Sequence, residues 1–151
     1  MKLLIYMILL LGVALLPTEA TDVGKLIPVE VIAVSENRGI VTVETDTGDA
    51  GQGRTLEEAF EDMEKTAPGV IYLDTAAYLI LEPGMEGQAA TLGAYLKDSV
   101  RVCRGREGIP LEGIAAYLAV HKPDVKLKAV PGKAELLVIR EENGRYELSE
   151  K

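Results

Sequence analysis

The chain has 151 residues, with 48% hydrophobic and 26% charged side chains, which is the length and composition of one globular domain. Its 24 acidic residues outnumber 16 basic ones, and the net charge of −8 argues against binding to nucleic acid or anionic lipid, because both need clustered positive charge. The single cysteine, Cys103, and single histidine, His121, exclude an internal disulfide and cannot supply the about four ligands of a usual structural zinc site. We therefore expect no nucleic-acid partner, no metal and no cofactor.

Residues Met1–Ala20 are typical of a secretory signal. Lys2 supplies a positive charge, Leu3–Leu16 is an unbroken apolar run, and Pro17 precedes small residues suited to cleavage after Ala20. A buried core helix is disfavoured because the run is apolar on every face. Cleavage would leave residues 21–151 as a single domain, whereas an uncleaved segment would be a signal anchor. Both alternatives predict an extracytoplasmic location, either secreted or held at the outer face of the membrane.

The first predicted unit is a β-hairpin. Val29–Val34 and Ile40–Thr45 are rich in β-branched residues, which favour strands. The connecting run Ser35–Gly39 is turn-forming, and we expect Asn37 and Gly39 to take positive φ.

An amphipathic helix is predicted after Thr55. Thr55 and Glu58 have the spacing of a capping box, and Pro68 with Gly69 ends the helix. Apolar residues recur at helical spacing, which predicts one buried stripe: Leu56, Ala59, Phe60 and Met63. The opposite face is acidic, and we expect it to be solvated and free to meet a partner: Glu57, Glu58, Glu61, Asp62 and Glu64.

The rest of the chain alternates between strands and helices. Predicted strands are Val70–Leu73, Tyr78–Leu81, Val100–Cys103, Val125–Val130, Ala134–Arg140 and Arg145–Leu148, the last two joined by a turn at Glu142–Gly144. Helices are predicted over Gly87–Lys97 and from Pro110 to before Pro123. The order predicts an α+β or α/β domain, with a mixed sheet packed by about three helices.

The glycine-rich stretch Gly48–Thr55 has the spacing of a phosphate-binding P-loop. Arg54 stands where that loop needs lysine, and Asp49 would put a carboxylate inside an anion site. The strand before it belongs to a hairpin, whereas a P-loop follows a buried parallel strand. We interpret the stretch as a turn into a capped helix and expect no bound nucleotide.

Candidate nucleophiles are few. Cys103 and His121 are the one possible Cys–His pair, and we expect Cys103 to be a buried or inert thiol. No serine lies in a nucleophile-elbow motif. Carboxylate pairs that cleave glycosides could be drawn from many acidic residues, so a secreted hydrolase using acidic residues stays an alternative.

Five segments follow one another in a recognisable order: an apolar strand pair, a glycine before a Thr-Leu-x-x-Ala helix start, two apolar segments, a helix ending in Leu-x-x-Tyr-Leu, and a short strand. They are Val29–Val34 with Ile40–Thr45, Gly53–Ala59, Val70–Leu73 with Tyr78–Leu81, Leu92–Leu96, and Val100–Cys103. This order resembles the N-terminal domain of the C-subunit family of spore germinant receptors, the Ger(x)C-type proteins. The chain departs from that family in lacking its lipidated cysteine, in being shorter, and in having Asp74 and Thr75 where the family has a Gly-His step.

The resemblance implies a non-catalytic, membrane-proximal protein that acts through protein contacts. Together with the signal segment, it predicts an extracytoplasmic interaction domain, related to sporulation or spore germination, with a protein partner at the outer face of the membrane. No catalytic, cofactor-binding or metal-binding residue is predicted.

Overall fold

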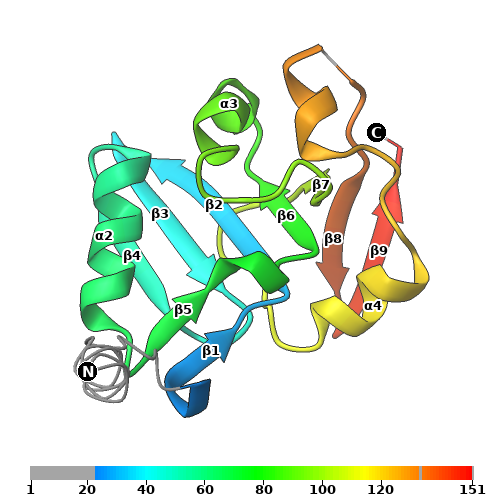
Figure 1. The fold of residues 1–151 in the computed structure, drawn as a ribbon. Helices are drawn as coiled ribbons and strands as arrows, with labels where there is room; N and C mark the ends of the chain where they lie inside the picture. Colours follow the sequence, from blue (N-terminus) through cyan, green and yellow to red (C-terminus); the bar gives the residue numbers. More distant parts are fainter. Residues whose placement is uncertain (1–22, 133, 151) are drawn as a thin grey trace, which may run out of the picture.

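The computed structural model describes residues 23–132 and 134–150 (Figure 1). The expected signal segment, residues 1–20, lies outside the described residues, as does Lys133. Within the described ranges no helix is both long enough and apolar enough to cross a membrane. The predicted α+β class, with a mixed sheet in a single domain, is confirmed.

Seven strands form one mixed sheet, in the spatial order β4 (Ala50–Gly53), β3 (Ile40–Thr45), β2 (Val31–Asn37), β6 (Tyr78–Leu81), β7 (Arg101–Arg104), β8 (Val138–Glu142) and β9 (Arg145–Ser149). The central strands β2, β6, β7 and β8 are parallel, and the outer strands β3, β4 and β9 pair antiparallel. β8 pairs with β7 only at Arg104 and Val138, so β8 starts at the level where β7 ends.

A separate two-stranded ribbon lies at one end of the domain. The 3-10 helix η1 (Val23–Lys25) leads into β1 (Leu26–Pro28), which pairs in parallel with β5 (Val70–Tyr72). β1 was not predicted, because three residues ended by a proline carry little strand signal. In Figure 1 the ribbon lies beside α2 (Leu56–Thr66), near the start of the described chain.

The two faces of the main sheet have separate hydrophobic cores. On one face α2, α3 (Ala89–Leu92) and the 3-10 helix η4 (Leu127–Gly132) cover the sheet, with the ribbon contributing Ile71. On the other face α4 (Ile114–Val120) packs on β6, β7 and β8 through Ile114 and Leu118. The prediction of about three helices is therefore correct for the described residues.

The predicted stripe of α2 is confirmed, because Leu56, Ala59, Phe60 and Met63 are all buried. Phe60 also stacks on Tyr95, with 4.2 Å between the ring centroids. The opposite, acidic face of α2 is exposed apart from Asp62, whose carboxylate accepts a hydrogen bond from the backbone of β4.

The two later helices are shorter than predicted. Gly87–Lys97 divides into a 3-10 helix η3 (Met85–Gln88), α3 and a series of turns. The helix expected from Pro110 begins only at Ile114, because Gly113 has φ +76°, a left-handed conformation that an α-helix cannot continue through.

The strand predicted over Val125–Val130 is wrong. One isolated bridge joins Lys126 to Arg101, and the segment then forms η4. Its two buried side chains, Leu127 and Val130, are three residues apart, the spacing at which a 3-10 turn presents one face.

The remaining strand boundaries differ by a few residues. The strand predicted over Val29–Val34 spans Val31–Asn37, and the one predicted from Ala134 starts at Val138. Val70–Leu73 ends one residue early, because Leu73 begins the 3-10 helix η2 (Leu73–Thr75).

Both hairpin turns form where the sequence predicted them. Asn143 and Gly144 take positive φ at the β8–β9 turn, as a two-residue hairpin requires. In the β2–β3 turn the residues with positive φ are Arg38 and Gly39, so the expectation for Asn37 is wrong. A two-residue loop pairs Asn37 with Ile40, which makes Asn37 the last residue of β2.

Candidate functional site

A concave site lies at the carboxyl ends of β6 and β7. In open sheets with parallel strands, ligands bind outside the carboxyl ends of the strands, because neighbouring connections separate there. The chain leaves β6 into η3, which carries Glu86, and Arg104 is the last residue of β7. Two oppositely charged side chains from adjacent strand ends are thereby brought together.

Glu86 and Arg104 form an ion pair, in which Arg104 Nε donates to Glu86 Oε1 at 2.5 Å. Both side chains are largely covered, with exposed fractions of 25% and 28%. Partial burial would raise the pKa of Glu86, but the N–H groups of Glu86 and Gly84 and the Arg104 guanidinium outweigh it and hold the pKa below its ordinary value. Gly84 offers its N–H at 2.8 Å from a left-handed conformation, φ +102°, that favours glycine.

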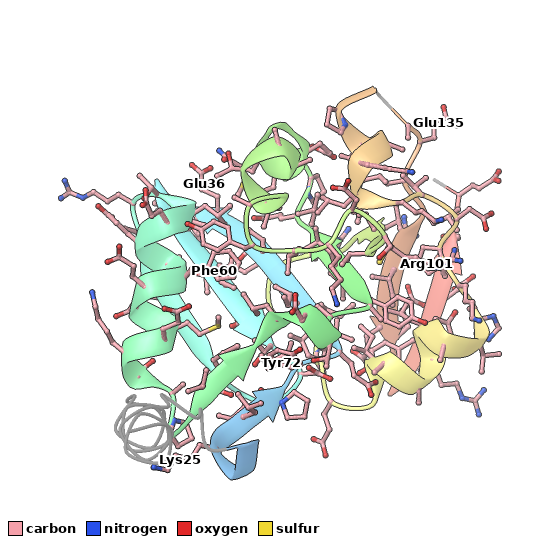
Figure 2. The ribbon with its side chains drawn as sticks, viewed as in Figure 1. Lys25, Glu36, Phe60, Tyr72, Arg101 and Glu135 are labelled. Atoms are coloured by element: carbon pink, nitrogen blue, oxygen red, sulfur yellow. The ribbon has the colours of Figure 1, made fainter. Side chains whose placement is uncertain are left out.

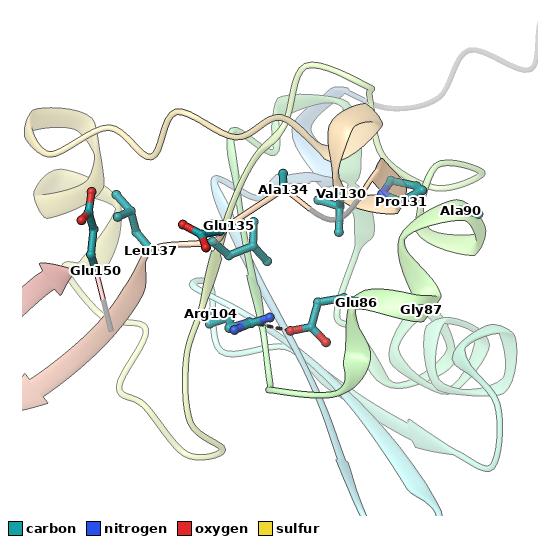
Figure 3. A pocket seen from close by; sticks show the side chains of 11 residues that line it. Glu86, Gly87, Ala90, Arg104, Val130, Pro131, Ala134, Glu135, Leu137 and Glu150 are labelled. Carbon is teal, nitrogen blue, oxygen red and sulfur yellow. Dashed lines mark hydrogen bonds and ion pairs between the residues drawn. The ribbon is translucent and has the colours of Figure 1, made fainter.

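The ion pair lies in a cavity of about 860 Å³. Figure 3 shows Glu86 and Arg104 meeting on one side and Val130, Pro131 and Ala134 on the other. The described lining comprises Glu86, Gly87, Ala90, Arg104, Val130, Pro131, Ala134, Glu135, Leu136, Leu137 and Glu150. Its volume lies within the range of known ligand pockets, about 300–1,000 Å³.

The described lining is acidic at the mouth and apolar along the walls. Glu135 and Glu150 are exposed, so they form a rim, whereas Val130 and Leu136 are buried walls. Three carboxylates face one guanidinium, and that guanidinium is already paired with Glu86. A cationic group with an aliphatic stem, such as a lysine or arginine side chain, complements both the charge and the walls.

The cavity brings carboxylates together, as the hydrolase alternative requires. Glycoside cleavage needs one carboxylic acid that keeps its proton near neutral pH, which requires a raised pKa. Glu86 has a lowered pKa and donates nothing while it is paired with Arg104. Its environment suits a fixed negative charge that orients Arg104.

The glycine-rich stretch, Gly48–Thr55, is not the turn that the sequence predicted. It completes a β3–β4 hairpin and then forms the edge strand β4 beneath α2. A methyl group on Gly51 would overlap the backbone of Ala59 and Met63, and one on Gly53 would overlap Glu58. These glycines therefore serve close helix–strand packing.

The start of α2 is already satisfied by its own side chains. Thr55 Oγ1 accepts the N–H of Glu58 at 3.2 Å, and the Glu58 carboxylate accepts the N–H of Arg54 at 2.7 Å. Asp49 is likewise engaged locally, with its carboxylate 2.8 Å from the Thr47 hydroxyl. With Glu57 also in the first turn, this helix terminus presents negative charge where a phosphate would bind.

Cys103 and His121 do not form a catalytic pair at the cavity. Cys103 is fully buried in the core beneath α4, and burial raises the pKa of its thiol to about 12. His121 is exposed at the end of α4, where its ring stacks on Tyr117 at 4.5 Å. The predicted burial of Cys103 is confirmed. Among the described residues no group of three His, Cys, Asp or Glu side chains could hold a metal ion.

Sequence reasoning missed the pairing of Glu86 with Arg104. The sequence held one indication, because Arg104 directly follows a predicted strand and Glu86 comes five residues after the end of another. What the sequence did not give was that β6 and β7 are parallel neighbours, and only that adjacency brings the two residues together.

Comparison with protein families, with curated proteins and with solved structures found no match for this chain.

Proposed function

We propose that this chain is a non-catalytic, extracytoplasmic protein-interaction domain, and that the cavity at the carboxyl ends of β6 and β7 receives its partner. The observation that carries the proposal is the acidic, apolar-walled cavity built around the Glu86–Arg104 pair. The signal-like segment Met1–Ala20 supports the location, and the resemblance to Ger(x)C-type proteins supports a role in spore germination.

The chemistry of the described lining specifies the partner. Glu135 and Glu150 at the rim attract a basic surface, and Arg104, the one basic residue of the described lining, is already paired with Glu86. Pro131, Ala134 and Leu137, which are at least partly exposed, then offer apolar area to the stem of an inserted side chain. Such an interface gains association rate and specificity from charge, so its formation weakens as the salt concentration rises.

Site-specific photo-crosslinking tests this proposal. A photoreactive residue replaces Ala90, which lines the cavity, in cells that make the protein and in their spores. The matched control is Ala94, which is also exposed and follows α3 but is not part of the described lining. We expect one reproducible adduct from position 90, absent from position 94 and reduced by 0.5 M salt.

Charge reversal tests whether the acidic rim is responsible for the crosslinked adduct. The double variant Glu135→Lys with Glu150→Lys should abolish the adduct, whereas Glu135→Asp should retain it. Equal adducts at positions 90 and 94, or an adduct indifferent to charge reversal, would contradict the proposal.

Normal germination of spores that lack the chain would contradict the germination role. If purified protein cleaves oligosaccharides and Glu135→Gln abolishes the cleavage, the hydrolase alternative is correct instead.

A further inference from the structure

The outward face of the β1–β5 ribbon is an apolar surface at the end of the domain away from the cavity. In a strand, alternate side chains point to opposite faces. Ile71 is buried and Ile27 packs against the same core, so their neighbours on each strand face outward. The outward residues are Leu26, Pro28, Val70 and Tyr72, which we call the ribbon face.

The residues of the ribbon face form one contiguous surface. Leu26 is the register partner of Val70, and Pro28 is the register partner of Tyr72. Val70 is 50% exposed and Tyr72 40% exposed, and Pro28 is exposed as well. Single exposed apolar residues are ordinary, but Pro28, Val70 and Tyr72 are exposed together beside the partly exposed Leu26, which indicates a contact surface.

The position of the ribbon face identifies what covers it. β1 is the first strand of the described residues, and ten residue steps separate Leu26 from Leu16, the end of the apolar run Leu3–Leu16. An extended linker of that length spans at most about 35 Å. If the run is retained as an anchor, the ribbon face is held within that distance of a bilayer.

The chemistry of the ribbon face matches the membrane–water interface. Tyrosine is enriched there, because its ring is apolar and its hydroxyl meets the headgroups. Lys25 is exposed directly before β1, with a long aliphatic stem that reaches polar headgroups from an apolar surface. Figure 2 shows Lys25 at the lower left, Tyr72 nearer the centre at the other end of the ribbon, and Glu135 of the cavity rim at the upper right.

We propose that the β1–β5 ribbon face docks on the lipid surface, with Val70 and Tyr72 in the interface and the cavity directed away from it. This inference rests on the extracytoplasmic location in the proposed function, with the apolar run retained as an anchor, and it adds the orientation of the domain. The net charge of −8 makes attraction to anionic lipid ineffective, so the contact is apolar and insensitive to salt. A face this small binds weakly by itself, but a short tether supplies a high effective concentration of lipid.

Fluorescence quenching in vesicles tests the orientation. The full chain, made by cell-free synthesis so that residues 1–22 are retained, is inserted into phosphatidylcholine vesicles that contain brominated lipid. A thiol-reactive dye is placed at Val70→Cys, and the matched control is Val120→Cys, which is 77% exposed on the other side of the sheet. Cys103 is fully buried, so it does not react with the dye in the folded protein.

We expect the dye at position 70 to be quenched at least threefold more than the dye at position 120, equally in low and high salt. Adding Tyr72→Asp should reduce the quenching at position 70 to the level at position 120. Both labelled proteins should melt like the unlabelled protein, which shows that the cysteines have not disturbed the fold.

Three results would overturn the inference. The first is equal quenching at the two positions, and the second is a full chain that does not float with the vesicles. The third is seen in detergent, without lipid. If the dye at position 70 becomes more shielded from solvent as the protein concentration rises, the ribbon face contacts a second copy of the chain. None of these outcomes affects crosslinking at Ala90, so the inference and the proposed function fail separately.

Discussion

The two ends of this domain differ in the side chains that they bury and expose. At the cavity end, charged side chains are drawn inward, and Glu86 and Arg104 satisfy each other under partial cover. At the ribbon end the two short strands β1 and β5 pair in parallel, and Val70 and Tyr72 are left facing outward. The cavity end therefore suits a charged partner and the ribbon end an apolar one.

Both ends nevertheless depend on one hydrophobic core. The core cluster beneath α2 and α3 includes Ile71 of the ribbon as well as Val130 and Leu136 of the cavity wall. A substitution in the middle of that cluster should alter the packing beneath both surfaces, whereas the structural effect of a substitution at either surface should stay local. Variants at the centre of the core, at the ribbon and at the cavity test this difference between the two ends.

Phe60→Ala should have the largest effect, because Phe60 is 1% exposed and stacks on Tyr95 in the shared core. We expect a loss of about 3–5 kcal/mol in the free energy of unfolding. Urea unfolding followed by dyes at positions 70 and 90 measures the loss at each end. The two transitions should stay coincident, and separate midpoints would show that the two ends are independent units. Val120→Ala, at an exposed position, is the control.

Gly69→Ala should change the native structure at the ribbon end alone, although its cost in stability is shared by the whole domain. A methyl group on Gly69 would overlap the carbonyl oxygen of Lys25, which lies on the backbone just before β1. We expect a cost of about 1–3 kcal/mol, as for other overpacked sites, together with a change in the dye signal at position 70. Gly87→Ala at the cavity end is the matched control, because nothing lies within 4 Å of the added methyl group. Equal destabilisation by both variants would contradict the steric explanation.

Glu86→Gln should have the smallest of these effects, about 1 kcal/mol at pH 7, because the Glu86–Arg104 pair is only partly covered. Folding lowers the pKa of Glu86, so its contribution is complete above the unfolded pKa and is lost as the pH falls through the folded value. The difference between wild type and variant should therefore shrink below about pH 4.

A double-mutant cycle with Arg104→Gln isolates the interaction of the pair from the hydrogen bonds that Glu86 accepts from backbone N–H groups. The exposed pair of Lys65 and Glu61, with side chains 72% and 58% exposed, is the control and should show little coupling. A stability difference for Glu86→Gln that stays constant from pH 3 to pH 7 would contradict the assignment of charge at the cavity.

Local patterns predicted those elements whose own residues specify them. The α2 stripe and its Thr55 cap follow from 3.6-residue spacing and capping chemistry, and the Asn143–Gly144 turn follows from the two residues that most readily take positive φ. Local patterns failed where contacts with residues distant in the sequence determine the secondary structure. The run Val125–Val130 alternates like a strand, yet it has a single isolated bridge to Arg101 and turns into η4.

The candidate site was beyond the reach of local patterns for the same reason. Glu86 and Arg104 are 18 residues apart, and each by itself is an unremarkable polar residue after a strand. The sequence also emphasised Gly48–Thr55, whose glycines serve the packing of β4 against α2. Glycine spacing reports where the backbone is approached closely, but not whether a ligand or a helix approaches it.

The sequence by itself determined the α+β class, the buried face of α2, the two hairpin turns and the acidic net charge, because these depend on composition and on neighbours along the chain. The tertiary structure decided the parallel adjacency of β6 and β7, the pairing of Glu86 with Arg104, and the ribbon that leaves Val70 and Tyr72 outward. These features depend on which strands pair across the sheet, and strand pairing is selected by the packing of the whole core and not by any one segment.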